Sequence, residues 1–281
     1  MLSKLFIHEW KDSWKLMAIL NGSVLVLSVA GIALNAFSDS VDLSKAFESG
    51  GAFSVMLYGS FFMLYVLSIF ALSIGSALYF YIRFYRNLYT DQGYLMHTLP
   101  VNEHSLILSK ALIAVIWRIV GMVIMALGIG SLMVSFMIPL FRTEYLSIKD
   151  IYRELGLADI NPMYMFAYAV LGILLGIGSV IFSVFMGYAA ISIGQLASKN
   201  KVLASVGAFF GIQIALSIAS NIITQSVMFA AFRFDFRWDL IDNYGPLSIL
   251  YLCGMNVAVY GLSVGFYFIT HAIMKNRLNL E

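Results

Sequence analysis

Charged residues are scarce in this sequence. Of its 281 residues, only 11% are Asp, Glu, Lys or Arg, whereas a soluble domain carries about a quarter. Hydrophobic residues make up 61% of the chain, and the mean hydropathy is +0.88. This balance is typical of a polytopic membrane protein and excludes an ordinary water-soluble domain.

Cysteine and the residues of common catalytic motifs are equally sparse. The single cysteine, Cys253, excludes a disulfide within the chain and a site built from several thiolates, and it is interpreted as a small hydrophobe in an apolar run. None of the four histidines belongs to an H-E-x-x-H zinc motif, and no G-x-x-x-x-G-K-[ST] phosphate loop is present. We therefore expect no catalytic residues, no metal site and no ATP-binding site in this chain.

Carboxylates are absent from the long apolar runs. A helix needs about 20 apolar residues to cross the hydrocarbon of a bilayer. Six runs qualify, over residues 17–37, 52–82, 111–140, 163–196, 202–231 and 247–274. Ion-coupled transporters keep a carboxylate in the membrane, and membrane-embedded proteases need paired acids or histidines there, so neither class is favoured. Arg118 is the only charge well inside a run; it can snorkel toward the interface, and a role as a pore charge stays open.

The basic residues are unevenly divided between the segments that join these runs. With the N-terminus in the cytoplasm, eleven of the 17 Lys and Arg residues fall on the cytoplasmic side, against five of the 15 Asp and Glu residues. The positive-inside rule then places both termini in the cytoplasm, and an even number of spans agrees, because it puts both termini on the same side. We predict an all-α, multi-pass protein of the cell membrane, with one transmembrane domain over 1–281, a cytoplasmic segment at 83–110 and extracellular loops at 141–161 and 232–246.

The segment before the first span, "LSKLFIHEWKDSWK", has an amphipathic pattern. Its apolar residues share one helical face and its lysines the opposite face: Leu2, Leu5, Phe6, Trp10 and Trp14 against Lys4, Lys11 and Lys15. This pattern favours a helix over residues 1–15 that lies in the membrane interface, with tryptophans at headgroup depth. Glu9 and Asp12 argue against deep burial. The alternative is a continuous extension of the first span.

The fifth span carries a polar stripe. Its members fall at i, i+4, i+7, i+8 and i+11 on one helical face: Gln213, Ser217, Ser220, Asn221 and Thr224. Polar side chains in a membrane tend to face protein or a water-filled cavity. Two interpretations stay open: the stripe lines a translocation path, or it holds helices together by hydrogen bonds.

A mixed polar and apolar segment, "YTDQGYLMHTLPVNE", joins the second and third spans. Its apolar residues would prefer burial, and Pro100 disfavours helical geometry at the residue before it. One or two helical turns are therefore predicted over "GYLMHTLP". Such a turn, held between two long spans, fits a groove in a soluble partner, whereas the alternative is a solvated connector.

Two segments, "LFIHEWKDSWK" and "RNLYTDQGYLMHTLPVNEHSLILSK", together with the six-span topology, resemble the six-helix permease subunits of type-2 ABC exporters of Gram-positive bacteria. The resemblance implies an N-terminal interfacial elbow helix containing Glu9 and Trp10. It also implies that the second segment holds a coupling helix in contact with an ATPase subunit. The implied contact residues are Tyr94, Leu95, Met96, His97, Thr98, Leu99 and Pro100.

The same resemblance implies the partners. Two permease chains, identical or homologous, would assemble with two ATPase subunits that bind ATP and Mg²⁺, while this chain would bind no cofactor and no nucleic acid. A peptide, a lipid or a hydrophobic compound would be the exported substrate. A sensory or immunity protein of the same topology that does not transport is the alternative, and the presence of the ATPase partner separates the two.

The predicted topology can be tested by cysteine labelling. Ser147→Cys and Asp242→Cys are expected to react with a membrane-impermeant thiol reagent applied to intact cells, because both positions lie in predicted extracellular loops. Asn200→Cys is expected to react only after permeabilisation. Labelling of Asn200→Cys from outside would reverse the whole orientation.

Overall fold

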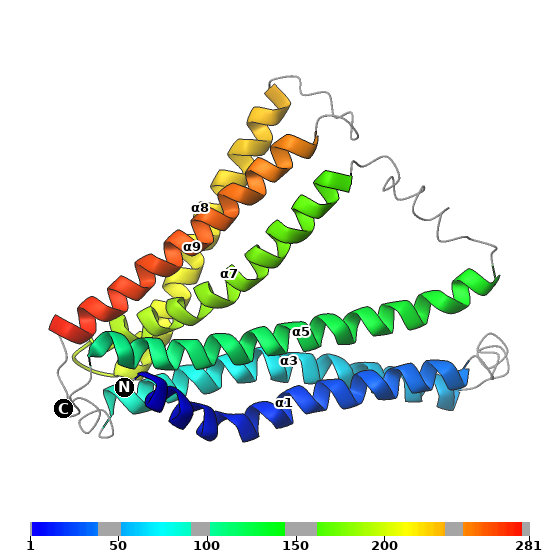
Figure 1. Ribbon diagram of the computed structural model, residues 1–281, viewed down its shortest axis with the longest axis horizontal. Helices are drawn as coiled ribbons and strands as arrows, with labels where there is room; N and C mark the ends of the chain where they lie inside the picture. Colours follow the sequence, from blue (N-terminus) through cyan, green and yellow to red (C-terminus); the bar gives the residue numbers. More distant parts are fainter. Residues whose placement is uncertain (1, 39–51, 91–101, 144–161, 234–243, 277–281) are drawn as a thin grey trace. The chain divides into compact units, whose positions relative to one another are not determined.

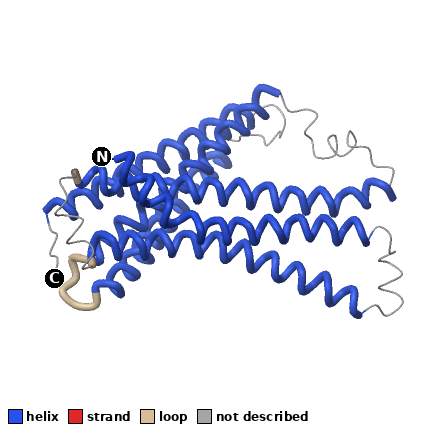
Figure 2. The backbone as a smooth tube through the Cα atoms, turned by 60° about the horizontal axis from the view of Figure 1, so that its bottom comes forward, coloured by secondary structure: helices blue, strands red, loops and turns tan. Residues whose placement is uncertain are grey.

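The computed structural model describes residues 2–38, 52–90, 102–143, 162–233 and 244–276, which are helical almost throughout (Figure 1). The helices are α1 (Leu2–Ser38), α3 (Ala52–Tyr89), α5 (Glu103–Thr143), α7 (Pro162–Gly194), α8 (Lys201–Arg233) and α9 (Tyr244–Asn276). Figure 2 shows a short loop between α7 and α8 and no strand in the described part of the chain. Each of these six helices is long and apolar enough to cross a membrane, which confirms, for the described residues, the predicted all-α architecture with six helices able to span a membrane.

The helices extend beyond the predicted spans. They contain between 33 and 41 residues, whereas about 20 residues cross the hydrocarbon. Helix α3 continues to Tyr89 and α5 begins at Glu103, so helix occupies much of the segment 83–110 that was predicted to connect them. The extra turns are accommodated by tilt or by projection beyond the bilayer.

The helix starts follow from local chemistry. The carbonyl of Asn102 accepts the backbone N–H groups of Ser105 and Leu106, at 2.9 and 3.3 Å, and Asn is a favoured residue just before a helix. Helix α7 begins with Pro162, and Pro246 lies in the first turn of α9. Proline is tolerated there because the N–H groups of a first turn have no partner within the helix.

Helix α1 runs without a break from Leu2 to Ser38, so the structure does not separate an elbow helix over residues 1–15 from the first span. Figure 1 shows the first turns of α1 at an angle to its long remainder. The Ser13 hydroxyl donates to the carbonyls of Glu9 and Trp10, at 3.0 and 3.3 Å. Such bonds from serine to its own helix often bend the helix, which gives this angle a physical cause.

The chain divides into two compact units. The α1–α5 unit comprises residues 3–80 and 112–158, and thus α1 with most of α3 and α5. The α7–α9 unit comprises residues 81–111 and 159–281 together with the first two residues. The last turns of α3 and the first turns of α5 therefore belong with α7, α8 and α9.

A three-helix contact lies in the core of the α1–α5 unit. Val24, Tyr65 and Leu132, one from each helix, are buried there in a single apolar cluster. The Ser28 hydroxyl donates to the carbonyl of Val24 at 2.7 Å and lies 3.4 Å from the Tyr65 hydroxyl. A Cβ atom added at Gly128 of α5 would lie 2.6 Å from both hydroxyl oxygens, so the three helices meet closely only because residue 128 has no side chain.

In the α7–α9 unit, α7 is the central helix and packs on both α8 and α9. Met186 and Ala189 of α7 form a buried cluster with Phe266 of α9. Polar groups of α9 also reach the backbone of α7, since the Tyr260 hydroxyl donates to the carbonyl of Leu174 at 2.9 Å. Because no water competes inside a bilayer, such bonds fix how α9 is rotated against α7.

Gly128→Ala is expected to lower the free energy of unfolding by about 1–3 kcal/mol, the usual cost of overpacking a close contact. Gly130→Ala is the matched control: it lies on the same helix, its added Cβ would meet nothing within 4 Å, and alanine favours helix over glycine. Thermal unfolding of the purified protein in detergent measures both. Equal melting temperatures for Gly128→Ala and Gly130→Ala would contradict the three-helix contact.

Candidate functional site

The predicted contact residues between the second and third spans lie outside the described part of the chain. These are Tyr94, Leu95, Met96, His97, Thr98, Leu99 and Pro100, and their role in binding a partner stays a prediction. The structure does place the helix ends on either side of them. Both ends make specific contacts with α7 or α9, and these contacts define the candidate site.

The end of α3 is inserted against α7. The Tyr81 hydroxyl donates to the carbonyl of Ser183 at 2.6 Å. The Tyr81 ring lies against Gly187, where any added Cβ would collide with ring atoms. One turn further along α3, the buried ring of Phe84 stacks on Tyr188, with ring centroids 3.7 Å apart and planes within 7°. This face of α3 fits α7 through both shape and a hydrogen bond.

Tyr89, the last residue of α3, makes a second polar contact with α7. Its hydroxyl lies 2.7 Å from the Ser192 hydroxyl oxygen. Ser192 already donates its single proton to the carbonyl of Tyr188 at 2.8 Å, so Tyr89 is the donor to Ser192. Ser192 itself is fully buried. The contact therefore holds the end of α3 at the point where residues 91–101 begin.

The start of α5 is held by α9 through an aromatic cluster. The imidazoles of His104 and His271 stack face to face, with centroids 3.8 Å apart and planes within 16°. His104 Nδ1 forms a short hydrogen bond with the Tyr267 hydroxyl. The carboxylate of Glu103 lies 3.6 Å from His271 Nε2. Four side chains from two helices thus converge where residues 91–101 end.

This cluster is not arranged as a metal site. Its two imidazole rings are stacked on each other instead of converging on one point, and the described residues include no group of three His, Cys, Asp or Glu side chains able to hold a metal ion. The sequence singles out no role for His104 and does not pair it with His271. The available signal was that both lie near the predicted cytoplasmic boundary.

Both flanks of residues 91–101 belong to the α7–α9 unit. The first flank, the end of α3, contacts α7 through Tyr81, Phe84 and Tyr89. The second flank, the start of α5, contacts α9 through Glu103 and His104. A displacement of residues 91–101 would therefore reach α7 and α9 directly. The arrangement can transmit a mechanical load from the connecting segment to membrane helices.

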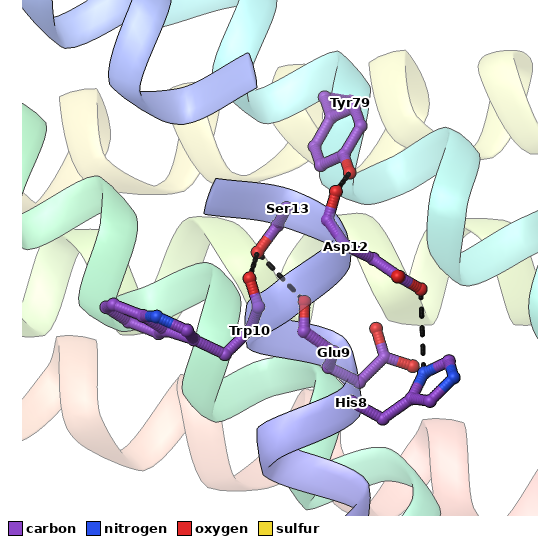
Figure 3. Close-up of polar contacts among 6 residues, drawn as sticks. All are labelled: His8, Glu9, Trp10, Asp12, Ser13 and Tyr79. Atoms are coloured by element: carbon purple, nitrogen blue, oxygen red, sulfur yellow. Dashed lines mark hydrogen bonds and ion pairs between the residues drawn. The ribbon is translucent and has the colours of Figure 1, made fainter. Parts of the chain in front are cut away.

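The first turns of α1 are held within the α1–α5 unit. Trp10 stacks on Trp117 of α5 with centroids 4.8 Å apart, and the Tyr79 hydroxyl donates to the carbonyl of Asp12 at 3.4 Å. Figure 3 shows the Tyr79 bond, the ion pair of Asp12 with His8, and the bonds of the Ser13 hydroxyl. Within the chain, Glu9 is 5% exposed, whereas Asp12 is exposed.

The polar stripe of the fifth span lies on α8. All five of its side chains are exposed in the isolated chain: Gln213, Ser217, Ser220, Asn221 and Thr224. Ser220 and Asn221 both donate to the carbonyl of Ser217, at 3.0 and 2.8 Å, and Thr224 lies 3.4 Å from the Tyr251 hydroxyl of α9. Of the six candidate spans, α8 is the least buried: only 6% of its most apolar stretch is covered by the rest of the chain. Among the described residues, the Thr224 contact is the one hydrogen bond by which this stripe joins α8 to another helix.

Comparison of the chain with protein-family models, with curated proteins and with solved structures gives no match.

Removal of the two α3 hydroxyls is expected to loosen the flank that precedes residues 91–101. In Tyr81→Phe with Tyr89→Phe both rings stay while two hydrogen bonds to α7 are lost, at about 0.5–1.5 kcal/mol each. Hydrogen exchange of the backbone amides of residues 85–90 is expected to accelerate, while exchange in α9 is unchanged. Tyr85→Phe removes a hydroxyl from the same turns that forms no hydrogen bond with the described residues of α7. Equal exchange in the double variant and in Tyr85→Phe would contradict the proposed anchoring.

Proposed function

We propose that the chain is the membrane-spanning permease subunit of an ATP-driven exporter of the type-2 ABC class. Separate ATPase subunits bind ATP and Mg²⁺ and contact the chain at residues 91–101. The chain itself carries no catalytic residue. A peptide, a lipid or a hydrophobic compound crosses the membrane along a path that the permease helices form.

The anchoring of both flanks of residues 91–101 carries this proposal. An external motor can drive membrane helices only if its contact segment is rigidly joined to them. The stack of Phe84 on Tyr188 and the stack of His104 on His271 provide such joints. A solvated connector between two spans needs neither of these stacks. A surface loop can link two helices without its flanks packing on two further helices.

The absence of a carboxylate from the predicted spans supports an external energy source. Proton- or sodium-driven transport needs an ionisable or coordinating group within the membrane. The buried charged groups that the structure does describe, Glu9 and Lys110, lie outside the six apolar runs. ATP hydrolysis in a separate subunit supplies the work without such a group.

The exposed stripe on α8 supports a second permease chain. Hydroxyl and amide groups that face lipid lose hydrogen bonds to water, which costs several kcal/mol per unsatisfied group. Gln213 and Ser217 are exposed in the isolated chain, as is Asn221, which donates a single bond to its own helix, so a second chain, identical or homologous, or a water-filled path between two chains covers this face. In this arrangement the stripe lines the translocation path or the contact between permeases.

The proposal also fixes the placement of the chain in the cell membrane. Both termini lie in the cytoplasm, as does the loop between α7 and α8. The bent first turns of α1 act as the interfacial elbow, with the partly exposed Trp10 and Trp14 at headgroup depth. The exposed Lys11 and Lys15 lie on its aqueous side.

Attachment of the ATPase tests the proposal. The affinity-tagged chain, purified in mild detergent from its native membranes, is expected to carry an ATPase subunit and ATP turnover. Leu95→Ala with Leu99→Ala is expected to lose most of both while it still inserts into the membrane, because truncation of a buried interface anchor costs about 2 kcal/mol or more. Leu64→Ala with Leu67→Ala is the matched control, since these leucines are exposed within the apolar part of α3.

The results separate the alternatives. Retention of the ATPase by the control but not by the Leu95 and Leu99 variant supports a coupling segment at residues 91–101. Full attachment and turnover in that variant would leave the segment as a connector. No ATPase with the unmodified chain would favour a sensory or immunity protein of the same topology.

A further inference from the structure

A groove of about 700 Å³ lies beside the loop between α7 and α8. It is lined by the loop residues Ser198 and Asn200, by the start of α8, and by Tyr85 of α3. Asn200 adopts a positive φ of 54°, a conformation that Asn tolerates better than most residues, and its carbonyl accepts the N–H of Ala204 at 3.0 Å. This tight turn brings Ser198 and Lys201 to the same groove.

The polar end of the groove is basic. Lys201 lines it, and the exposed Lys199 lies in the same turn. The hydroxyls of Tyr85 and Ser198 and the amide of Asn200 add hydrogen-bond donors. The described residues that line the groove include no Asp or Glu. This set of groups complements a phosphate.

The other end of the groove is apolar and open. Val202, Leu203 and Val206 line it and are 58%, 69% and 47% exposed. Leu203 and Val206 continue at helical spacing into Phe210 and Ile214 of α8, which are 59% and 58% exposed. A strip of apolar side chains therefore leads from the cationic end of the groove along the membrane-spanning part of α8.

We propose that this groove binds one anionic phospholipid of the surrounding membrane. Its phosphate lies between Lys199 and Lys201, and one acyl chain lies along Leu203, Val206 and Phe210. Basic pockets between membrane helices near the cytoplasmic surface are suited to anionic headgroups. A free phosphate would satisfy the lysines and leave the apolar strip unused, so the joined polar and apolar ends favour a lipid. The site rests on the proposed cytoplasmic placement of the loop between α7 and α8, but not on export.

Lipid binding to the purified chain tests this site. Native mass spectrometry in detergent counts bound lipid as phosphatidylglycerol or phosphatidylcholine with the same acyl chains is added. The unmodified chain is expected to prefer phosphatidylglycerol. Lys199→Gln with Lys201→Gln is expected to lose about 25-fold in affinity for it, since each lysine near a lipid headgroup contributes a factor of about five, while phosphatidylcholine binding stays unchanged.

The matched control is Lys11→Gln with Lys15→Gln, which removes the same charge from two exposed lysines of α1. It is expected to keep the preference for phosphatidylglycerol, and Lys199→Arg with Lys201→Arg is expected to keep most of it. An equal loss in both glutamine variants would mean unspecific charge attraction and would overturn the site. Displacement of phosphatidylglycerol by millimolar inorganic phosphate would show that the groove takes a soluble anion, and would overturn the lipid as its occupant.

Discussion

The close approach of Tyr81 to Gly187 is the constraint on which the arrangement around residues 91–101 depends. Any side chain at position 187 would occupy the space of the Tyr81 ring. Without that space, Tyr81 would not reach the Ser183 carbonyl, and Phe84 would not stack on Tyr188 in its present geometry. Tyr89 extends the same face of α3 to Ser192. One missing side chain on α7 thus sets the position of the last turns of α3, and these turns determine where the connecting segment starts.

The six spans could be predicted from the sequence because hydropathy is a local property. Each apolar run contains the information for its own helix, since a backbone in lipid must satisfy its hydrogen bonds within the segment. The ends of the helices were less predictable. Helix α3 continues past Arg83 and Arg86 to Tyr89, because its last turns are stabilised by packing on α7 rather than by hydrophobicity. The exposure of the α8 stripe likewise depends on neighbours, although its spacing was visible in the sequence.

The contacts that make the candidate site could not be predicted from local patterns. Gly187 and Tyr81 are far apart in the chain, as are His104 and His271, and the sequence offers no signal for the first pair and, for the second, only a shared position near the predicted cytoplasmic boundary. Glu9 illustrates the same limit. Its charge argues against deep burial in the membrane, and only the structure shows that other parts of the chain cover its side chain. Gly128 resembles Gly130 in the sequence, yet only Gly128 lies against Ser28 and Tyr65. In each case the deciding quantity is the distance to another helix.

The proposed functions of α8 are compatible because its outer face changes character along its length. Phe210, Ser217 and Asn221 fall at i, i+7 and i+11 and therefore share that face. Before Phe210 the face is apolar, through Leu203 and Val206, and suits an acyl chain. From Ser217 onward it is polar and exposed, and it suits water or a second chain. The mean hydropathy of the whole helix does not reveal this division. A lipid at the groove and a partner at the stripe would then occupy successive turns of one helix without competing for the same surface.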